Sequence, residues 1–276
     1  MRSLVLCLVI SWTAFAGGPV YTAESVVNSA SGLGAALAPN TLCTIYGKNL
    51  SWTTRQVQQS DIAGGQLPTV LTGTGVRVFV RNIAAYILYV SPTQINFLIS
   101  SQLMPGPADL WVALDGQAGP TVTVNLAEAA PALFLWAESS SKPLAAIAER
   151  LLFEKETNGY KWALATHDSP ARPGETIVLY ATGLGQTDPP VDEGRLPTMA
   201  AEVLERYLFD ITLDGTKVER ENIQYAGVAP TFGGLYQINL KLPDWAPENP
   251  EIRIVMKSGE SPAGVRVAAG AAAPAH

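Results

Sequence analysis

The chain has 276 residues, of which 47% are hydrophobic and 15% are charged, a composition that excludes a disordered protein and allows one large or two ordinary domains. The formal net charge is −6 and no basic run or stripe is present, which argues against binding to nucleic acid or to an anionic membrane surface. The 24 glycines and 20 prolines indicate many turns between short strands and favour an all-β fold.

Residues 1–16 have the pattern of a signal peptide. Arg2 precedes an apolar run that ends on Ala14-Phe15-Ala16, with small residues at the last and third-last positions. The run has about 13 residues, and a membrane-spanning helix needs roughly 20. We therefore expect a secreted, cell-surface or periplasmic protein with no stable membrane insertion after signal cleavage. Removal of the leader leaves Cys43 as the one cysteine, which excludes an intrachain disulfide.

The first predicted domain covers residues 17–134. Short segments rich in β-branched and aromatic residues, separated by Gly, Pro or Asn, predict strands at 41–46, 75–81, 85–89, 94–99, 109–114 and 121–126. The alternation within 75–81 places Val76, Val78 and Val80 on an inward face, with Arg77, Phe79 and Arg81 on the other. This number and spacing of strands predicts a β-sandwich.

Residues 135–168 form a connecting segment that the sequence describes in two ways. Asn158-Gly159 is a strong hairpin turn between two apolar runs and favours a β-hairpin, which we expect to bridge the two domains. Apolar residues from Leu144 to Leu152 also fit a helical stripe. The hairpin is the preferred interpretation.

The second predicted domain covers residues 169–269 and is followed by a low-complexity tail at 270–276. Its predicted strands are 175–180, 207–213, 222–225, 235–242, 251–257 and 264–268, with Asp214-Gly215 as a hairpin turn. We expect the tail to be frayed.

The two domains repeat one another. Three matches occur in the same order: residues 37–50 with 170–184, residues 67–69 with 196–198, and residues 89–96 with 227–231 followed by 236–239. This order predicts a duplicated domain. In the alignment Cys43 lies over Ile177, which indicates a core residue rather than a reactive thiol, and Asn49 lies over Gly183, which indicates a shared turn of positive φ.

The repeated phrases resemble a known family. They include Val27-Asn28-Ser29-Ala30-Ser31, Tyr46-Gly47-Lys48-Asn49-Leu50, Tyr89-Val90-Ser91-Pro92-Thr93-Gln94-Ile95-Asn96-Phe97, Val178-Leu179-Tyr180-Ala181-Thr182-Gly183-Leu184 and Gly234-Leu235-Tyr236-Gln237-Ile238-Asn239. The chain resembles the Solibacter-type uncharacterised C-terminal domain of secreted acidobacterial proteins. The resemblance implies two tandem immunoglobulin-like β-sandwiches of the IPT/TIG kind and an exported protein, without catalytic residues.

The sequence offers no catalytic site. The two histidines are His167 and His276, and no Gly-x-Ser-x-Gly elbow accompanies His167, so we predict that the protein is not an enzyme. Neither cofactor nor metal is expected. The weak calcium candidates are Asp188, Asp192 and Glu193, whose spacing matches no established calcium loop.

Binding candidates come from comparing the two copies. Trp111 lies opposite Leu110 and Val112 in strand alternation and aligns with Arg253, which indicates an outward face. Packing against the other domain, partner binding and a core position are the alternatives for this side chain. A second group, Gln94, Asn96, Gln237 and Asn239, forms either structural clamps to nearby backbone or a ligand-reading face.

The expected function is a non-enzymatic interaction module that binds extracellular carbohydrate or protein at the cell surface. An extracellular hydrolase with a site between the domains and a purely structural cell-surface spacer are the alternatives. Within the first interpretation, Trp111 is the residue most suited to stack on a sugar or to anchor a protein contact.

Overall fold

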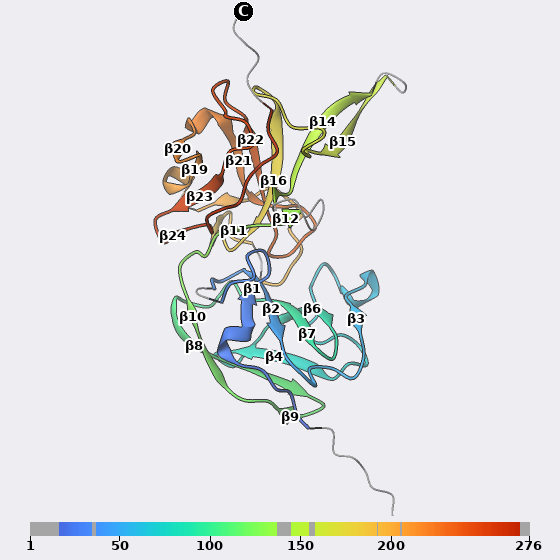
Figure 1. Cartoon of the computed structure of the whole chain (residues 1–276). Helices are drawn as coiled ribbons and strands as arrows, with labels where there is room; N and C mark the ends of the chain where they lie inside the picture. The colour runs from blue at the N-terminus through green and yellow to red at the C-terminus, as the bar shows by residue number, and fades with distance from the viewer. Residues whose placement is uncertain are drawn as a thin grey trace, which may run out of the picture.

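The computed structural model describes residues 17–34, 37–136, 145–154, 158–191, 193–204 and 206–270. The predicted leader and all of the predicted tail beyond Gly270 lie outside these residues. Within them the protein contains no α-helix, every pairing between strands is antiparallel, and two sandwiches lie end to end (Figure 1). The all-β prediction is confirmed. The helical turns are the 3₁₀ helices η1 (Ala23–Ser25), η2 (Gln59–Asp61), η3 (Arg206–Leu208) and η4 (Arg220–Asn222).

The first sandwich has two five-stranded sheets. One sheet has the order β1 (Val26–Asn28), β2 (Leu42–Tyr46), β7 (Gln94–Leu98), β6 (Tyr86–Val90) and β3 (Arg55–Gln56). The other has the order β10 (Val122–Leu126), β8 (Gly106–Leu114), β4 (Val76–Val80) and β5 (Ile83–Ala84), with β9 (Gln117–Ala118) paired to β8. Their inner faces enclose one apolar core, to which Val76, Val78 and Val80 contribute as predicted.

The second sandwich has one large and one small sheet. The large sheet has the order β15 (Gly159–Leu164), β14 (Ala148–Glu154), β16 (Thr176–Thr182), β22 (Tyr236–Lys241), β21 (Ile223–Val228), β18 (Glu202–Val203) and β17 (Thr187–Asp188), with β11 (Ala132–Leu133) also paired to β16. The small sheet has the order β20 (Thr216–Lys217), β19 (Asp210–Leu213), β23 (Ile252–Met256) and β24 (Gly259–Glu260). A separate pair, β12 (Leu135–Trp136) and β13 (Ala145–Ala146), lies between β11 and β14 in the chain, and Leu135 and Ala146 pack in the core of the second sandwich.

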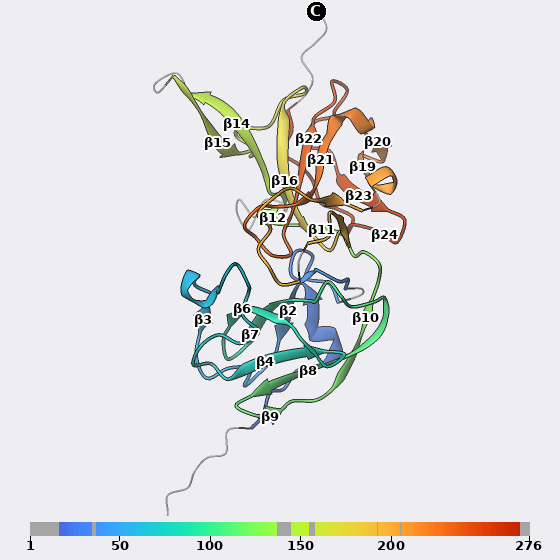
Figure 2. The ribbon, with the colours of Figure 1, turned by 180° about the vertical axis from the view of Figure 1, so that it is seen from behind.

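The predicted hairpin forms, but its position differs from the expectation. β14 and β15 pair from Glu149 opposite Leu164 to Glu154 opposite Gly159, so Gly159 is already part of the ladder and the connection is longer than a two-residue turn. β14 also pairs with β16, which makes the hairpin the margin of the second sandwich. It projects away from the first domain in both Figure 1 and Figure 2. The prediction that this hairpin bridges the two domains is therefore wrong.

Two further boundaries differ from the sequence prediction. Ala132 and Leu133, placed at the end of the first domain, pair with Thr182 and Ala181 and so belong to the second sandwich. The strand predicted at 264–268 is reduced to an isolated bridge between Arg266 and Glu251. In each case the pairing partner is distant in sequence, where local propensity has no influence.

The duplication is visible in the backbone. Asn49 and Gly183 both have positive φ, at 55° and 77°, as their alignment predicted. The ladders β6–β7 and β21–β22 each contain a register shift, after which Tyr89 faces Asn96 and Tyr225 faces Asn239. Tyr225 is therefore the structural counterpart of Tyr89, although the sequence alignment placed Gly227 there. The difference arises because β21 has two more residues before its hairpin turn than the alignment assumed.

A buried apolar cluster joins the two domains. Leu67, Tyr86 and Leu98 of the first domain form its centre, and Leu196 of the second packs against them. Gly194 fits here because a side chain would collide with the Tyr86 ring: a Cβ at this position would lie 2.1 Å from the ring.

Hydrogen bonds cross the same interface. The Asn40 side-chain amide donates to the Tyr236 hydroxyl over 2.9 Å, and the Leu42 backbone N–H donates to Thr182 Oγ1 over 2.9 Å. Tyr236 is fully buried, and its hydroxyl also donates to the Gly185 carbonyl. A buried polar group of this kind is costly to leave without partners, so these bonds fix the two sandwiches against one another.

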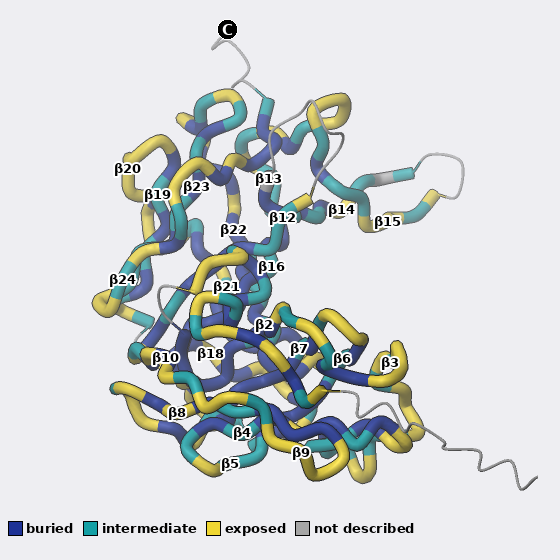
Figure 3. Tube along the Cα trace, turned by 60° about the horizontal axis from the view of Figure 1, so that its bottom comes forward, coloured by how far each residue is buried: buried dark blue, intermediate teal, exposed yellow. Residues whose placement is uncertain are grey.

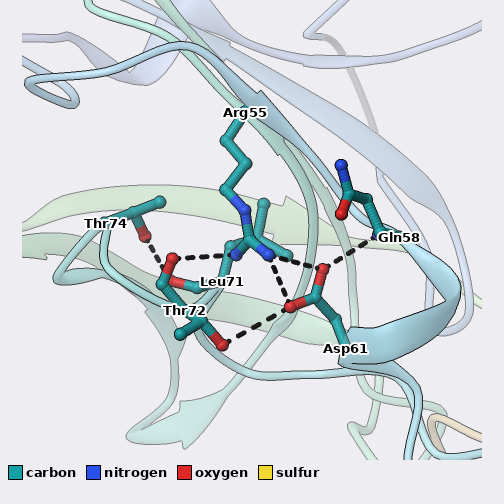
Figure 4. A network of polar contacts seen from close by, with 6 residues as sticks. All are labelled: Arg55, Gln58, Asp61, Leu71, Thr72 and Thr74. Atoms are coloured by element: carbon teal, nitrogen blue, oxygen red, sulfur yellow. Dashed lines mark hydrogen bonds and ion pairs between the residues drawn. The ribbon is translucent and has the colours of Figure 1, made fainter.

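A polar network holds the long connection between β3 and β4 in the first domain (Figure 4). Arg55 Nη2 donates to both carboxylate oxygens of Asp61 at 2.8 and 3.0 Å, and Arg55 Nη1 donates to the Thr72 carbonyl at 2.9 Å. The backbone N–H of Gln58 and the bound Arg55 hold the pKa of Asp61 below its usual range. The network anchors the loop that leads to β4, and so to the sheet β10-β8-β4-β5.

Candidate functional site

The outer face of the sheet β10-β8-β4-β5 carries two stacked aromatic rings. Phe79 on β4 lies directly opposite Trp111 on β8, and alternation turns both away from the core that holds Val78, Leu110 and Val112. The ring centroids are 4.1 Å apart and the ring planes meet at 14°. Neither ring is buried, so the pair forms a partly exposed platform.

An open hollow of about 580 Å³ borders this platform. It is lined by Arg81, Asn82, Pro107, Asp109, Trp111 and Thr121. Trp111 borders the hollow, and Phe79 stacks on its ring from the neighbouring strand β4. The hollow therefore combines one aromatic surface with amide, carboxylate, guanidinium and hydroxyl groups.

The polar groups around the hollow are held to different degrees. The Arg81 guanidinium donates to the backbone carbonyls of Met104 and Pro107, at 2.9 and 2.7 Å, and so fixes the start of β8 against the end of β4. Asp109 accepts a hydrogen bond from Thr123 through Oδ1 at 3.0 Å. The Asn82 side chain has no hydrogen-bond partner among the described residues, which leaves its amide available to a ligand.

Trp111 is therefore outward, as the comparison with Arg253 predicted, but neither the second domain nor the hairpin covers it. The aromatic neighbour is Phe79 of the same sheet, and the hollow beside it is lined by residues 81 to 121 alone. Of the three alternatives for Trp111, packing against the other domain and burial in the core are wrong. Phe79 was not singled out from the sequence, although its place on the outer face followed from the alternation of β4.

The four amide candidates lie on the other sheets and form the same contact in both domains. Gln94 Nε2 donates to Asn96 Oδ1 over 2.8 Å, and Gln237 Nε2 donates to Asn239 Oδ1 over 2.8 Å. The sequence predicted that these amides bond to the backbone of a neighbouring loop. Instead, each glutamine bonds to the asparagine two residues further along its own strand. The structure does not bring these residues to the Trp111 hollow.

Two of the three calcium candidates, Asp188 and Glu193, border one hollow at the domain interface. Glu193 accepts a hydrogen bond from Ser100 across the domain interface, Asp188 is exposed, and Asp192 lies outside the described residues. Among the residues that the structure describes, no group of three or more His, Cys, Asp or Glu side chains is placed to hold a metal ion.

Cys43 is fully buried in the first core, and burial raises the pKa of its thiol. It packs as the small apolar residue that its alignment with Ile177 predicted. His167, the candidate base of a hydrolase, lies in the bend between β15 and β16.

A second depression, of about 270 Å³, lies between the domains. Its apolar lining includes Leu103, Met104, Leu184, Leu204, Leu208 and Met256, and its charged residues are Glu128 and Lys257. No histidine or cysteine is among the described residues that line it.

No family model matches the chain, and no curated protein sequence matches it. Similar solved structures include a surface glycan-binding protein from Prevotella bryantii, with 12% identity and a TM-score of 0.24 over 91% of this chain and 42% of that chain. Domains 5–6 of the S-layer protein SbsC are 8% identical, with a TM-score of 0.26 over 92% of this chain and 100% of that chain. The tandem Ig repeats of Dlar are 8% identical, with a TM-score of 0.20 over 93% and 96%.

The chain spans 42% of the length of the Prevotella bryantii protein, and 46% of the length of a similar protein of unknown function from Bacteroides thetaiotaomicron. With TM-scores of 0.20 to 0.26, these likenesses carry no argument about this chain, and its function has to be inferred from its own residues. Within the described residues, no helix is long and apolar enough to cross a membrane.

Proposed function

We propose that this chain is an exported, non-enzymatic interaction module whose first domain binds extracellular carbohydrate at the Trp111 hollow. The observation that carries the proposal is the Phe79–Trp111 stack, because it presents a rigid indole surface beside polar groups on a solvent-exposed face of the sheet. The C–H surface of a sugar ring packs on an aromatic face, and its hydroxyls need donors and acceptors at the edge of that face.

The polar groups favour a ligand rich in hydroxyls. The Asn82 amide, the Thr121 hydroxyl and the carboxylate of Asp109 offer both donors and acceptors. Because backbone carbonyls already engage the Arg81 guanidinium, its role in the site is to hold the scaffold. The resemblance to the Solibacter-type family and the leader-like residues 1–16 support an exported or cell-surface location.

The proposal is tested by screening the protein on a glycan array in three forms: unchanged, Trp111→Ala and Trp245→Ala. Trp245 is the control, since it is a tryptophan with an exposed fraction of 39% and lies in the second domain. We expect glycans bound by the unchanged protein and by Trp245→Ala to be lost with Trp111→Ala. Equal binding by all three forms would remove Trp111 from the site. Hydrolysis of an ester or glycoside panel by the unchanged protein would contradict the non-enzymatic assignment.

A further inference from the structure

The β14–β15 hairpin carries an exposed apolar face. Leu151 and Trp162 are direct cross-strand partners, with exposed fractions of 49% and 58%, and Tyr160 is 70% exposed. Leu151, Tyr160 and Trp162 lie on one face, because opposite residues share a face and alternate residues return to it. The hairpin stands out from the body in Figures 1 and 2, and most of β15 is coloured as exposed or intermediate in Figure 3.

β15 is also the edge of the eight-stranded sheet, since its described pairing is with β14 alone. The backbone N–H of Ala165 donates to the Ala148 carbonyl, which makes these two residues a hydrogen-bonded pair. Pairs alternate along an antiparallel ladder, so Lys161 and Ala163 bond to β14, whereas Trp162 and Leu164 direct their backbone groups outward. An outer row of backbone donors and acceptors is thus available beside an apolar face.

Edge strands are usually protected by lysine, proline, a bulge or a covering loop. β15 contains no proline and its ladder with β14 has no register shift. Its single charge, on Lys161, is paired with Glu154 of the neighbouring strand. Apart from the paired Lys161, the edge lacks the features that keep exposed strands apart.

We propose that β15 pairs antiparallel with β15 of a second copy of this chain, across a two-fold axis normal to the sheet. Such a pairing must set outward-directed residues opposite one another. A register centred on Trp162 places Trp162 opposite Trp162 of the second copy, Tyr160 opposite Leu164, and Lys161 opposite Ala163. A shift in one direction sets Lys161 opposite Lys161, which like-charge repulsion disfavours. A shift in the other direction sets Ala163 opposite Ala163 and leaves Tyr160 without a partner in β15, which ends at Leu164.

A second copy suits this edge better than an unrelated strand, because β15 is self-complementary in the register centred on Trp162. Apolar side chains then lie opposite one another on one face, and no two like charges are paired. The projecting hairpin also keeps the two bodies apart. One six-residue strand buries far less than the roughly 800 Å² per partner of a standard interface, so the dimer is weak and reversible. The dimer does not involve the Trp111 hollow.

Sedimentation velocity over a concentration series tests the association. The unchanged protein is expected to pass from one to two chains as its concentration rises to the order of hundreds of micromolar, and Trp162→Lys to weaken the dimer by at least about tenfold. Phe232→Lys is the matched control, because Phe232 is 59% exposed and lies in the connection between β21 and β22. A monomer at every concentration, or equal association of both variants, would overturn the proposal.

Cysteine cross-linking tests the register. Trp162→Cys places two thiols opposite one another, so mild oxidation is expected to give a disulfide-linked dimer on a non-reducing gel. Leu164→Cys is expected not to cross-link, since two copies of residue 164 would lie about 14 Å apart, four residues along the ladder. Cross-linking of Leu164→Cys in preference to Trp162→Cys would contradict the register, and cross-linking of neither would contradict the pairing.

Discussion

The sheets β10-β8-β4-β5 and β20-β19-β23-β24 occupy equivalent places in the two sandwiches, and their outer faces differ in chemistry. In the first domain Phe79 stacks on Trp111, whereas the corresponding strands of the second domain pair Thr212 with Arg253. Arg253 forms an ion pair with Glu260 at 2.8 Å. The inner faces agree because the fold requires them, whereas the outer faces differ: the first domain carries an aromatic stack and the second an ion pair.

The largest effects are expected where the two domains agree. Leu110 and Ile252 are fully buried on equivalent strands, and replacing either by alanine removes apolar contacts and leaves a cavity. Leu110→Ala and Ile252→Ala should each lower the free energy of unfolding by about 2–5 kcal/mol in urea denaturation. An effect below about 1 kcal/mol at either position would show that the inner faces are not equivalent.

The next effect concerns a position where the copies differ inside the molecule. Tyr236 aligns with the exposed Thr93 and is fully buried at the domain interface, where Asn40 donates to its hydroxyl. Tyr236→Phe removes that hydroxyl and should cost about 1–3 kcal/mol of unfolding free energy. Tyr225→Phe is the control, because its hydroxyl bonds within the second domain. An equal loss of unfolding free energy in the two variants would show that the interface hydrogen bond contributes no more than one within a domain.

The aromatic platform itself predicts a moderate effect on binding. Phe79→Ala leaves Trp111 in place but removes its stacking partner, and such pairs contribute about 0.5–1.5 kcal/mol. Calorimetry with a glycan selected on the array should show a two- to tenfold weaker association, roughly that energy expressed as affinity. Unchanged affinity would mean that Phe79 does not orient the indole.

A smaller, pH-dependent effect separates Tyr180 from its counterpart Tyr46, which is 51% exposed. Burial, reinforced by the Glu149 carboxylate that accepts its hydroxyl hydrogen, raises the pKa of Tyr180 from 10.0 to about 12. Because the folded-state pKa lies above the unfolded value, the stabilisation is complete below pH 10 and is lost as the pH rises toward 12. Thermal unfolding measured across this range should decline less steeply in Tyr180→Phe; an unchanged slope would contradict the assignment.

The smallest effect is expected from the ionic face of the second domain. Arg253→Ala breaks a surface ion pair and should change the free energy of unfolding by at most about 1 kcal/mol, with glycan binding unaffected. A larger loss of stability would indicate that the backbone contact from Arg253 Nε to the Ser261 carbonyl, at 3.0 Å, matters more than the ion pair.

Much of this architecture could be predicted from local patterns. The alternation of Val76, Val78 and Val80 identified an inner face, and the alignment of Asn49 with Gly183 identified a positive φ that the backbone adopts. Both are properties of a few neighbouring residues. The pairing of β14 with β16 was not predicted, because the choice of partner for an edge strand depends on segments far apart in the sequence.

The candidate site was predicted in part. Comparing Trp111 with Arg253 indicated the outward face, but the assignment of a covering domain failed because local alternation gives the side of a sheet and not what lies over it. No sequence pattern indicated that Asn82 and Thr121 contribute to a site. They reach the hollow because a turn and a neighbouring strand bring them beside β8.

The most direct test of the carbohydrate-binding assignment is calorimetric titration of an array-selected glycan into the unchanged protein, Trp111→Ala and Arg253→Ala. Loss of the indole should weaken association by more than about tenfold, as expected of a central aromatic contact, whereas loss of the equivalent arginine should leave the affinity unchanged. Equal affinity in the unchanged protein and Trp111→Ala would contradict a binding site on the first domain's outer face.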